Sequence, residues 1–278
     1  MAELRTLIGT RYVQPLREGG SLPGVVDTHG GGLFVVKFRG AGQGARALIA
    51  EVIVGMLARE LGLPVPELAL IEVPPPLGSS EPDPEIQDVL RKSHGLNFGM
   101  RYLDGAFNYS PAAAEELIDP ELAASVVWLD ALVTNPDRTA RNPNLLINAR
   151  HPWLIDHGAA LYAHHNWAAV DEVRTRTPFP LIREHVLLRR ASALEPVDQR
   201  LAATLAEDRL RDVLASVPDE WLMDPVGPRD FASADEARAR YVAYLRARLA
   251  GPRPFLDEAV QARERVLRDL PVALKARR

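Results

Sequence analysis

The densest group of polar residues in the sequence lies between Asn135 and Ile147. Asp137, Asn142 and Asn144 belong to it, and Asp156 follows a short apolar run farther along the chain. Asn and Asp are also common turn formers, so each of these residues taken alone is explained as well by a turn. Together, two carboxylates and two amides can hold a hard cation through oxygen ligands.

A hairpin is expected to bring these residues together. Two apolar runs, 145–147 and 153–155, flank a turn expected at 148–152. If residues 147 and 153 pair in an antiparallel hairpin, Asn144 lies opposite Asp156. The cation site is therefore expected at the open end of this hairpin.

A lysine and a glutamate form a second candidate group. Lys37 lies in the apolar run 33–38, and Glu51 is the only charged residue between positions 47 and 58. A lone carboxylate on an apolar helix must be paired or neutralised, at a cost of about several kcal/mol otherwise. Lys37 is its nearest candidate partner in the sequence, although a lysine on an edge strand that reaches water explains Lys37 as well.

The two groups match the requirements of phosphoryl transfer. A lysine can hold phosphate oxygens, Asn and Asp can hold the metal ion, and an Asp can orient or deprotonate the attacking hydroxyl. The sequence thus predicts a phosphoryl-transfer site built from Lys37, Glu51, Asp137, Asn142, Asn144 and Asp156.

The elements that position these residues differ between the two parts of the chain. The first hundred residues read as strands around one helix, expected at 43–61 and closed by Gly62 and Pro64. The Pro-rich stretch 74–92 reads as an exposed loop. The expected strands are 12–16, 25–28, 33–38, 67–73 and 97–103, and the expected helices beyond them are 121–133, 199–216, 234–250 and 255–270. This pattern predicts an α+β fold with a strand-rich part at 1–104 and a mainly helical part at 105–278.

Composition excludes several classes of protein. The chain has 278 residues, a formal net charge of -4 and no cysteine. Disulfide frameworks, thiol catalysis and Cys-based metal sites are therefore excluded, and a dedicated nucleic-acid binder is disfavoured. No apolar run reaches the length of a membrane span, and the first ten residues do not read as a signal peptide. A cytoplasmic location is the resulting expectation.

The order of these residues resembles that of the protein-kinase-like fold, in which a small N-terminal lobe and a larger helical lobe meet at a cleft. Lys37 on a strand, Glu51 on the next helix, Asp137 with Asn142, and an Asp-x-Gly motif occur in that order. The local sequence is most similar to the HipA-like kinases, and more distantly to the phosphoinositide lipid kinases. The segments that carry the similarity are Leu-Gly-Leu-Pro-Val-Pro at 61–66, Asn-Pro-Asp-Arg at 135–138 and Leu-Ile-Asp-His-Gly at 154–158.

The resemblance implies a role for each polar residue of the catalytic group. Lys37 would contact the phosphates of ATP, and Glu51 would hold Lys37 in place. Asp137 would be the catalytic base, while Asn142 and Asp156 would bind Mg²⁺. Asn144, which directly precedes Leu-Leu, is the second candidate for the amide ligand.

The resemblance also implies two nucleotide-binding segments. Residues 19–24 would cover the phosphates, and residues 98–103 would contact the adenine side. The individual nucleotide-binding candidates are Gly20, Ser21, Gly24, Arg101 and Tyr102.

Three positions depart from the pattern of ordinary protein kinases. The glycine-rich segment 19–24 is not G-x-G-x-x-G, Thr139 stands where a lysine is common, and His157 replaces the usual Phe. No A-P-E motif follows Gly158. The phosphate acceptor stays open between a protein Ser or Thr, a small molecule and a lipid.

Two other functions compete with an active kinase. Gly40 to Ala45 has the form G-x-G-x-x-A, which is typical of dinucleotide-binding oxidoreductases, but the next candidate acid, Glu72, lies farther along than the usual spacing of about 20 residues. A nucleotide-binding pseudokinase or scaffold is the other alternative. The presence of all five kinase-like polar residues argues against it.

Overall fold

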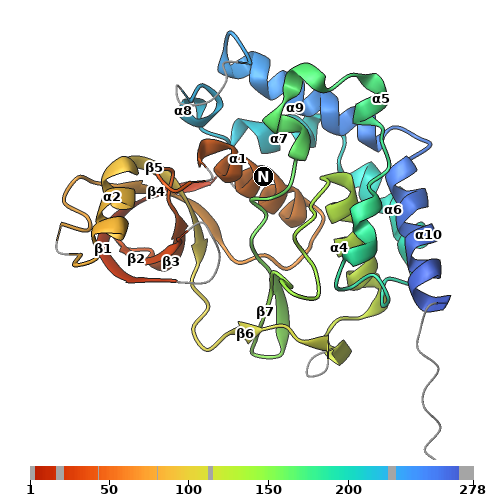
Figure 1. The fold of residues 1–278 in the computed structure, drawn as a ribbon, viewed down its shortest axis with the longest axis horizontal. Helices are drawn as coiled ribbons and strands as arrows, with labels where there is room; N and C mark the ends of the chain where they lie inside the picture. Colours follow the sequence, from red (N-terminus) through yellow and green to blue (C-terminus); the bar gives the residue numbers. More distant parts are fainter. Residues whose placement is uncertain are drawn as a thin grey trace, which may run out of the picture.

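The computed structural model describes residues 4–16, 22–42, 44–79, 81–111, 115–224 and 230–268. A closed barrel forms the N-terminal part of this described chain, and helices dominate the rest (Figure 1). The barrel order is β1-β2-β3-β5-β4, and its strands pair antiparallel except for the parallel pair β1 and β4. Its strands are β1 (Arg5–Pro15), β2 (Gly24–Thr28), β3 (Gly32–Lys37), β4 (Leu68–Val73) and β5 (Gly95–Arg101). The predicted α+β class is confirmed.

This barrel contradicts the dinucleotide-binding alternative. The motif begins after β3 and ends inside α1 (Gly44–Glu60), but β3 pairs with β2 and β5 and is not a neighbour of β4. A dinucleotide-binding unit needs parallel neighbouring strands on either side of its helix. The strand alternation of apolar residues in 33–38 therefore belongs to a barrel strand, and Lys37 does not lie on an edge strand.

The loop prediction for 74–92 was wrong in its second half. Helix α2 (Pro84–Lys92) occupies it, with Asp83 as the N-cap that accepts a hydrogen bond from the Glu85 N–H at 3.0 Å. Pro84 fits the first helical position because the missing N–H has no partner there in any helix. Ile86 and Leu90 of this helix are buried in the apolar core of the barrel.

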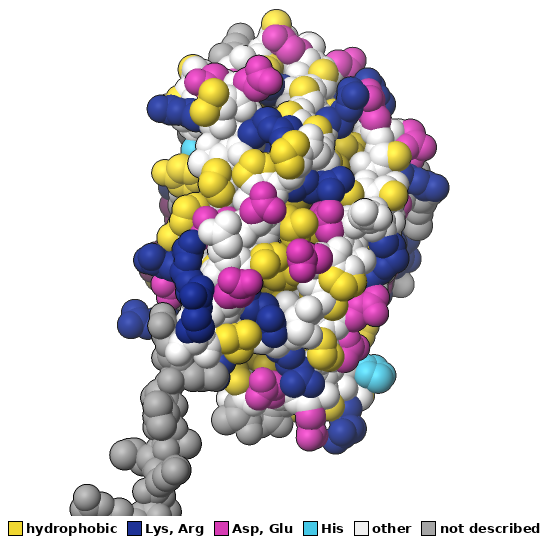
Figure 2. Space-filling model, turned by 90° about the vertical axis from the view of Figure 1, so that its right-hand side faces the viewer, with side chains coloured by type: hydrophobic (Ala, Val, Ile, Leu, Met, Phe, Trp, Pro, Cys, Tyr) yellow, Lys and Arg dark blue, Asp and Glu magenta, His cyan; other side chains and the backbone are white. Residues whose placement is uncertain are grey.

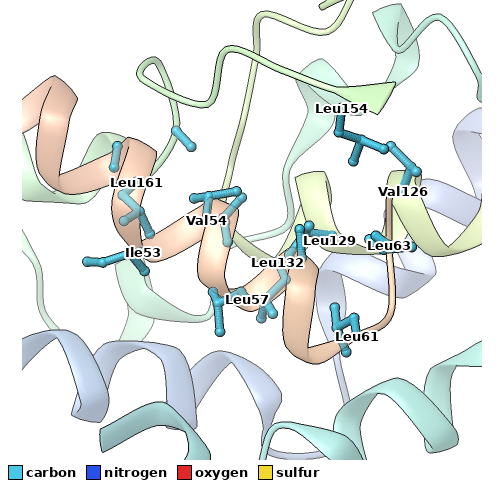
Figure 3. Packing of buried hydrophobic residues seen from close by; sticks show 14 of the residues in the cluster. Ile53, Val54, Leu57, Leu61, Leu63, Val126, Leu129, Leu132, Leu154 and Leu161 are labelled. Atoms are coloured by element: carbon cyan, nitrogen blue, oxygen red, sulfur yellow. The ribbon is translucent and has the colours of Figure 1, made fainter. Parts of the chain in front are cut away.

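Helix α1 lies between the barrel and the helical part (Figure 1). It is apolar all round, as expected for a helix that is covered on every side. Figure 3 shows Val54 and Leu57 of α1 packed near Leu129 and Leu132 of α4 (Pro120–Leu132). Each such buried side chain contributes about 1.5–3 kcal/mol, so the packing fixes where α1 presents Glu51.

The helical part follows the sequence prediction with one break. The predicted helix 199–216 is two helices, because Leu205 and Ala206 separate them. Helix α9 (Ala234–Leu249) is capped by Ser233, whose Oγ accepts a hydrogen bond from the Glu236 N–H at 3.2 Å. These helices are α5 (Glu172–Thr175), α6 (Leu194–Thr204), α7 (Glu207–Ala215), α8 (Asp219–Leu222), α9 (Ala234–Leu249) and α10 (Pro254–Arg268), and short 3-10 helices cover Glu115–Leu117, Tyr162–His165, Trp167–Ala169 and Pro180–Glu184.

The predicted hairpin is present, but its register is shifted by one residue. Strands β7 (Leu145–Asn148) and β8 (His151–Leu154) pair with Ile147 opposite Pro152, and β6 (Phe107–Asn108) adds a third strand. The turn has only two residues, Ala149 and Arg150, with φ values of 47° and 65°. Such a turn forces the shorter register.

The surface carries charges of both signs. Figure 2 shows Lys and Arg side chains interspersed with Asp and Glu over the face that lies on the right in Figure 1. Among the described residues, none of the helices has the length and apolar character required to cross a membrane.

Candidate active site

A cleft of about 700 Å³ brings most of the predicted site residues together. Its lining includes the apolar side chains of Val35, Met100 and Ile155. It also includes the predicted site residues Lys37, Glu51, Asn142, Asn144 and Asp156. Another cavity, of about 770 Å³, lies between the barrel and α8, but it contains none of these residues and is not the candidate active site.

Lys37, on barrel strand β3, contacts the acids Glu51 and Asp156 from two other segments of the chain. Its Nζ lies 2.5 Å from Glu51 Oε1 and 2.5 Å from Asp156 Oδ1. Its side chain is 12% exposed, and that of Glu51 is fully buried. The predicted pairing of Lys37 with Glu51 is therefore present, and Asp156 joins it from 119 positions away in the chain.

The Asp-His-Gly segment is fitted tightly against Glu51. The backbone N–H of His157 donates to Glu51 Oε1 at 3.0 Å. A Cβ at position 158 would approach the same oxygen to 3.1 Å, so only glycine fits without displacing Glu51. Asp156 adopts φ 54°, a left-handed conformation that Asp tolerates better than most residues. This turn directs the chain from β8 toward α1.

Asp137 is held by the two amides that the sequence singled out. Asn142 Nδ2 and Asn144 Nδ2 donate to Asp137 Oδ2 at 2.9 and 3.1 Å. The loop is closed by the Thr139 N–H, which donates to the Asn142 carbonyl at 2.9 Å. Asp137 does not itself line the cleft, but these bonds join it to Asn142 and Asn144, which do. Within the described chain its Oδ1 accepts no hydrogen bond.

A buried polar network that the sequence analysis missed supports this loop. Arg138, which directly follows Asp137, donates from Nε to Asp130 Oδ2 at 2.6 Å. Asn135 Nδ2 donates to Asp130 Oδ1 at 2.9 Å, and the Asp137 N–H donates to Asn135 Oδ1 at 3.1 Å. Asp130 and Arg138 are fully buried. The network therefore fixes the backbone on both sides of Asp137.

His185 joins the same network from a distant segment. Its Nδ1 accepts from the Leu187 N–H at 3.0 Å, so its Nε2 carries the proton and donates to Asp130 at 2.9 Å. Arg138 also reaches the Asp-His-Gly segment, because its Nη2 donates to His157 Nδ1 at 3.2 Å. The loop that carries Asp137 and the segment 156–158 are thus joined through the Arg138 guanidinium.

The charges of the site follow from these contacts. Burial favours neutral Lys37, but the two adjacent carboxylates raise its pKa above the usual range. Burial raises the pKa of Glu51, whereas the Lys37 ammonium lowers the pKa of Asp156 against the effect of burial. Burial also opposes ionisation of Asp130, but Arg138 holds its pKa far below the usual range. Lys37 therefore stays cationic while Asp156 and Asp130 stay ionised.

Buried histidines make stability depend on pH. Burial, and next the Arg138 charge, lower the pKa of His157 to about 3, against about 6.5 in an unfolded chain. Between these values the unfolded chain binds a proton that the folded chain does not, so the free energy of unfolding falls as pH falls. The His157 contribution is expected to be about 1.4 kcal/mol per pH unit below pH 6.

Urea unfolding at several pH values between 7 and 5 measures this slope. We expect His157→Gln to reduce this slope by the contribution of about one bound proton. His164 and His185 should still contribute to the slope, because burial lowers their pKa values too. His151→Gln, at an exposed position, is the matched control for the substitution itself. Equal slopes in wild type and His157→Gln would contradict the assignment.

The residues predicted to bind the nucleotide do not all line the cleft. Arg101 and Tyr102 line the cleft, but the Arg101 guanidinium is held by Glu67 and the Gly31 carbonyl, and the Tyr102 N–H donates to the Leu33 carbonyl at 3.0 Å. Gly24 starts β2, where a Cβ would meet the ring of Tyr12. Gly20 and Ser21 lie outside the described residues.

The oxygen atoms of the site fit a hard metal ion. Because Asn142 and Asn144 direct their Nδ2 atoms to Asp137, their amide oxygens are left to accept other contacts. Asp156 uses Oδ1 for Lys37, which leaves its second oxygen available. The described residues contain no cluster of three or more His, Asp or Glu side chains that could hold a metal, so amide oxygens would have to complete the set. Such a donor set suits Mg²⁺.

Known proteins share the family and the fold of this chain. A family model described as HipA-like kinase matches residues 10–240. The crystal structure of the Helicobacter pylori proinflammatory kinase CtkA is similar in fold, with a TM-score of 0.53 and 12% sequence identity over 95% of this chain and 99% of that chain. A comparison with curated proteins gives no match. Since the family model spans most of the sequence, the chain belongs to the HipA-like kinase family.

Proposed function

We propose that this protein is an ATP- and Mg²⁺-dependent phosphotransferase that acts on a hydroxyl acceptor. The observation that carries the proposal is the position of Lys37, which contacts Glu51 and Asp156 at 2.5 Å each inside the cleft. A lysine held between these two acids is suited to grip the phosphates beside a metal ion. In this proposal the barrel is the smaller lobe and the helical part the larger one, with the boundary near residues 104 and 105.

The apolar part of the cleft lining would supply a place for the adenine ring. Val35, Met100 and Leu146 line it, and a flat base buried among such side chains gains from the removal of apolar surface. Because the Tyr102 N–H is already bonded to Leu33, we assign the polar contact to the backbone of Leu103. Within the described chain the Leu103 N–H has no backbone acceptor.

The polar side chains of the cleft, together with Asp137, would supply the groups for the transfer. Lys37 would hold phosphate oxygens, and Asp156 with Asn142 or Asn144 would hold Mg²⁺. When bound, Mg²⁺ would neutralise charge on the phosphates. Asp137 would orient the acceptor hydroxyl and take its proton through Oδ1, as the new O–P bond forms and the bond from the γ-phosphorus to the bridging oxygen breaks. Asn142 and Asn144, by donating to Oδ2, would hold the Asp137 carboxylate in a fixed orientation.

Incubation with γ-labelled ATP and Mg²⁺ tests this function. Transfer of label to the protein, to an added lysate protein, to lipid or to a small molecule supports a kinase and identifies the acceptor class. Nucleotide binding with no transfer to any fraction would favour the pseudokinase. Label transfer that persists in excess EDTA would contradict the metal requirement.

Replacing Lys37 by Arg should lower the rate of transfer about 100-fold. The Lys37 side chain is 12% exposed and its compact ammonium fits between two carboxylates, whereas the larger planar guanidinium must displace one of them. The exposed Lys92, which pairs with Asp88 on α2, gives the matched control Lys92→Arg. Steady-state transfer rates that are equal in Lys37→Arg and wild type would contradict the proposed role.

A further inference from the structure

Positive charge near the transferred phosphate is scarce in this cleft. Among the described residues that line it, the cationic side chains are Lys37, Arg101 and Arg141. Lys37 is bound by two carboxylates, and Arg101 is bound by Glu67. Arg138 lies next to Asp137, but it is buried and points to Asp130. Lys37 is already assigned to the phosphates in the proposed function, so Arg141 is the one further cation of this set that has no acidic partner among the described residues.

Arg141 has a fixed backbone and an uncommitted side chain. It directly precedes Asn142, whose N–H and carbonyl are both bonded to Thr139. The Arg141 side chain is exposed, lines the cleft and, among the described residues, forms no hydrogen bond or ion pair. A guanidinium offers five N–H donors in a planar fork that matches phosphate oxygens. A rigid loop that presents a free guanidinium beside a catalytic carboxylate is suited to bind a charged group only when substrate arrives.

We infer that Arg141 binds the γ-phosphate of ATP and stabilises the charge that moves during transfer. The inference rests on the proposed function and adds a further catalytic residue to it. Arg141 shares the cleft with Lys37, so the phosphate chain would pass between a cation on the barrel and a cation on the catalytic loop. Thr139, at the position where protein kinases commonly have a lysine, is neutral and bonds to Asn142, so Arg141 would supply the charge that Thr139 does not.

Comparison of two nucleotides isolates the γ-phosphate. Calorimetric titrations with Mg²⁺ and either ADP or the β,γ-imido analogue of ATP would be made for wild type and for Arg141→Gln. We expect the substitution to weaken binding of the analogue about tenfold, as for loss of a charge-assisted hydrogen bond, and to change ADP affinity less than about twofold. The rate of phosphate transfer is expected to fall about 100-fold.

Arg189 provides the matched control. It is exposed, forms no hydrogen bond or ion pair in the described part of the chain and does not line the cleft, so Arg189→Gln should leave both affinities unchanged. An unchanged ratio of analogue to ADP affinity in Arg141→Gln would overturn the inference and leave the proposed function intact. A raised KM for the acceptor with an unchanged kcat would also overturn it, because Arg141 would then serve the acceptor. A wild-type protein that binds neither nucleotide would overturn the proposed function and this inference together.

Discussion

Replacing Asp137 by Asn is expected to lower the rate of phosphate transfer about 100- to 10,000-fold, the range found when a general base is removed. The amide has nearly the same shape as the carboxylate, but it cannot take the proton of an acceptor hydroxyl. It also conflicts with its neighbours, because Asn142 and Asn144 both donate to Asp137 Oδ2 and an amide nitrogen there would face donors. Nucleotide affinity should stay within about threefold of wild type, since Asp137 makes none of the proposed phosphate contacts.

Single-turnover transfer from labelled ATP, together with nucleotide titration, measures the two quantities separately. The control is Asp208→Asn, an exposed aspartate on α7 far along the chain from the cleft residues, which should behave as wild type. Full transfer by Asp137→Asn would remove Asp137 from the mechanism. A parallel loss of nucleotide affinity and rate would instead assign Asp137 to binding.

Replacing Asp130 by Asn is expected to destabilise the fold by about 3–5 kcal/mol, the cost of leaving one partner of a buried ion pair uncompensated. Asp130 and Arg138 are both fully buried, and the two Asp130 oxygens accept from Arg138, His185 and Asn135. Asparagine keeps the shape but removes the charge that holds the guanidinium. Urea unfolding followed by far-UV circular dichroism measures the free energy of unfolding.

The same substitution separates support of the loop from direct chemistry. Asp208→Asn is again the control and should change the free energy of unfolding by less than about 0.5 kcal/mol. If Asp130→Asn yields too little folded protein, His185→Gln removes one hydrogen bond to Asp130 and should cost about 1–3 kcal/mol. A loss below about 1 kcal/mol in Asp130→Asn would contradict the structural role of the network.

The lone acid on an apolar helix was the most informative pattern in the sequence. It predicted the pairing of Glu51 with Lys37, and the structure contains this pair. Asp130 is the same kind of residue, since the helix around it is apolar and the residue is buried. The reasoning used for Glu51 would also have identified Asp130, with Arg138 as a candidate partner nearby in the sequence. His185 carries no comparable signal, because its partner lies 55 positions away and only the tertiary fold joins them.

Turn geometry limited the prediction of the hairpin. The elements were identified correctly, but the two-residue turn Ala149-Arg150 lacks the Asn-Gly or Asp-Gly pair that usually marks such turns. Asn144 therefore bonds to Ile155 and not to Asp156. The Ile155 N–H donates to the Asn144 carbonyl at 3.1 Å. Asp156 reaches the site by its left-handed backbone conformation, which no spacing rule reveals.

Helix α2 shows how composition can mislead. Prolines and acidic residues favoured a loop at 74–92, yet Asp83 followed by Pro84 is a regular helix start. The burial of Ile86 and Leu90 against the barrel gives this short helix its stability.

Phosphate transfer from ATP in this cleft is the proposed activity of the protein. The most direct measurement is transfer of label from γ-labelled ATP with Mg²⁺, by wild type and Asp137→Asn at equal concentration, each with and without lysate. We predict a labelled product with wild type that is lost on adding EDTA and reduced at least about 100-fold with Asp137→Asn. Equal labelling by the two proteins, or no labelled product in any fraction with wild type that binds ATP, would contradict the proposal.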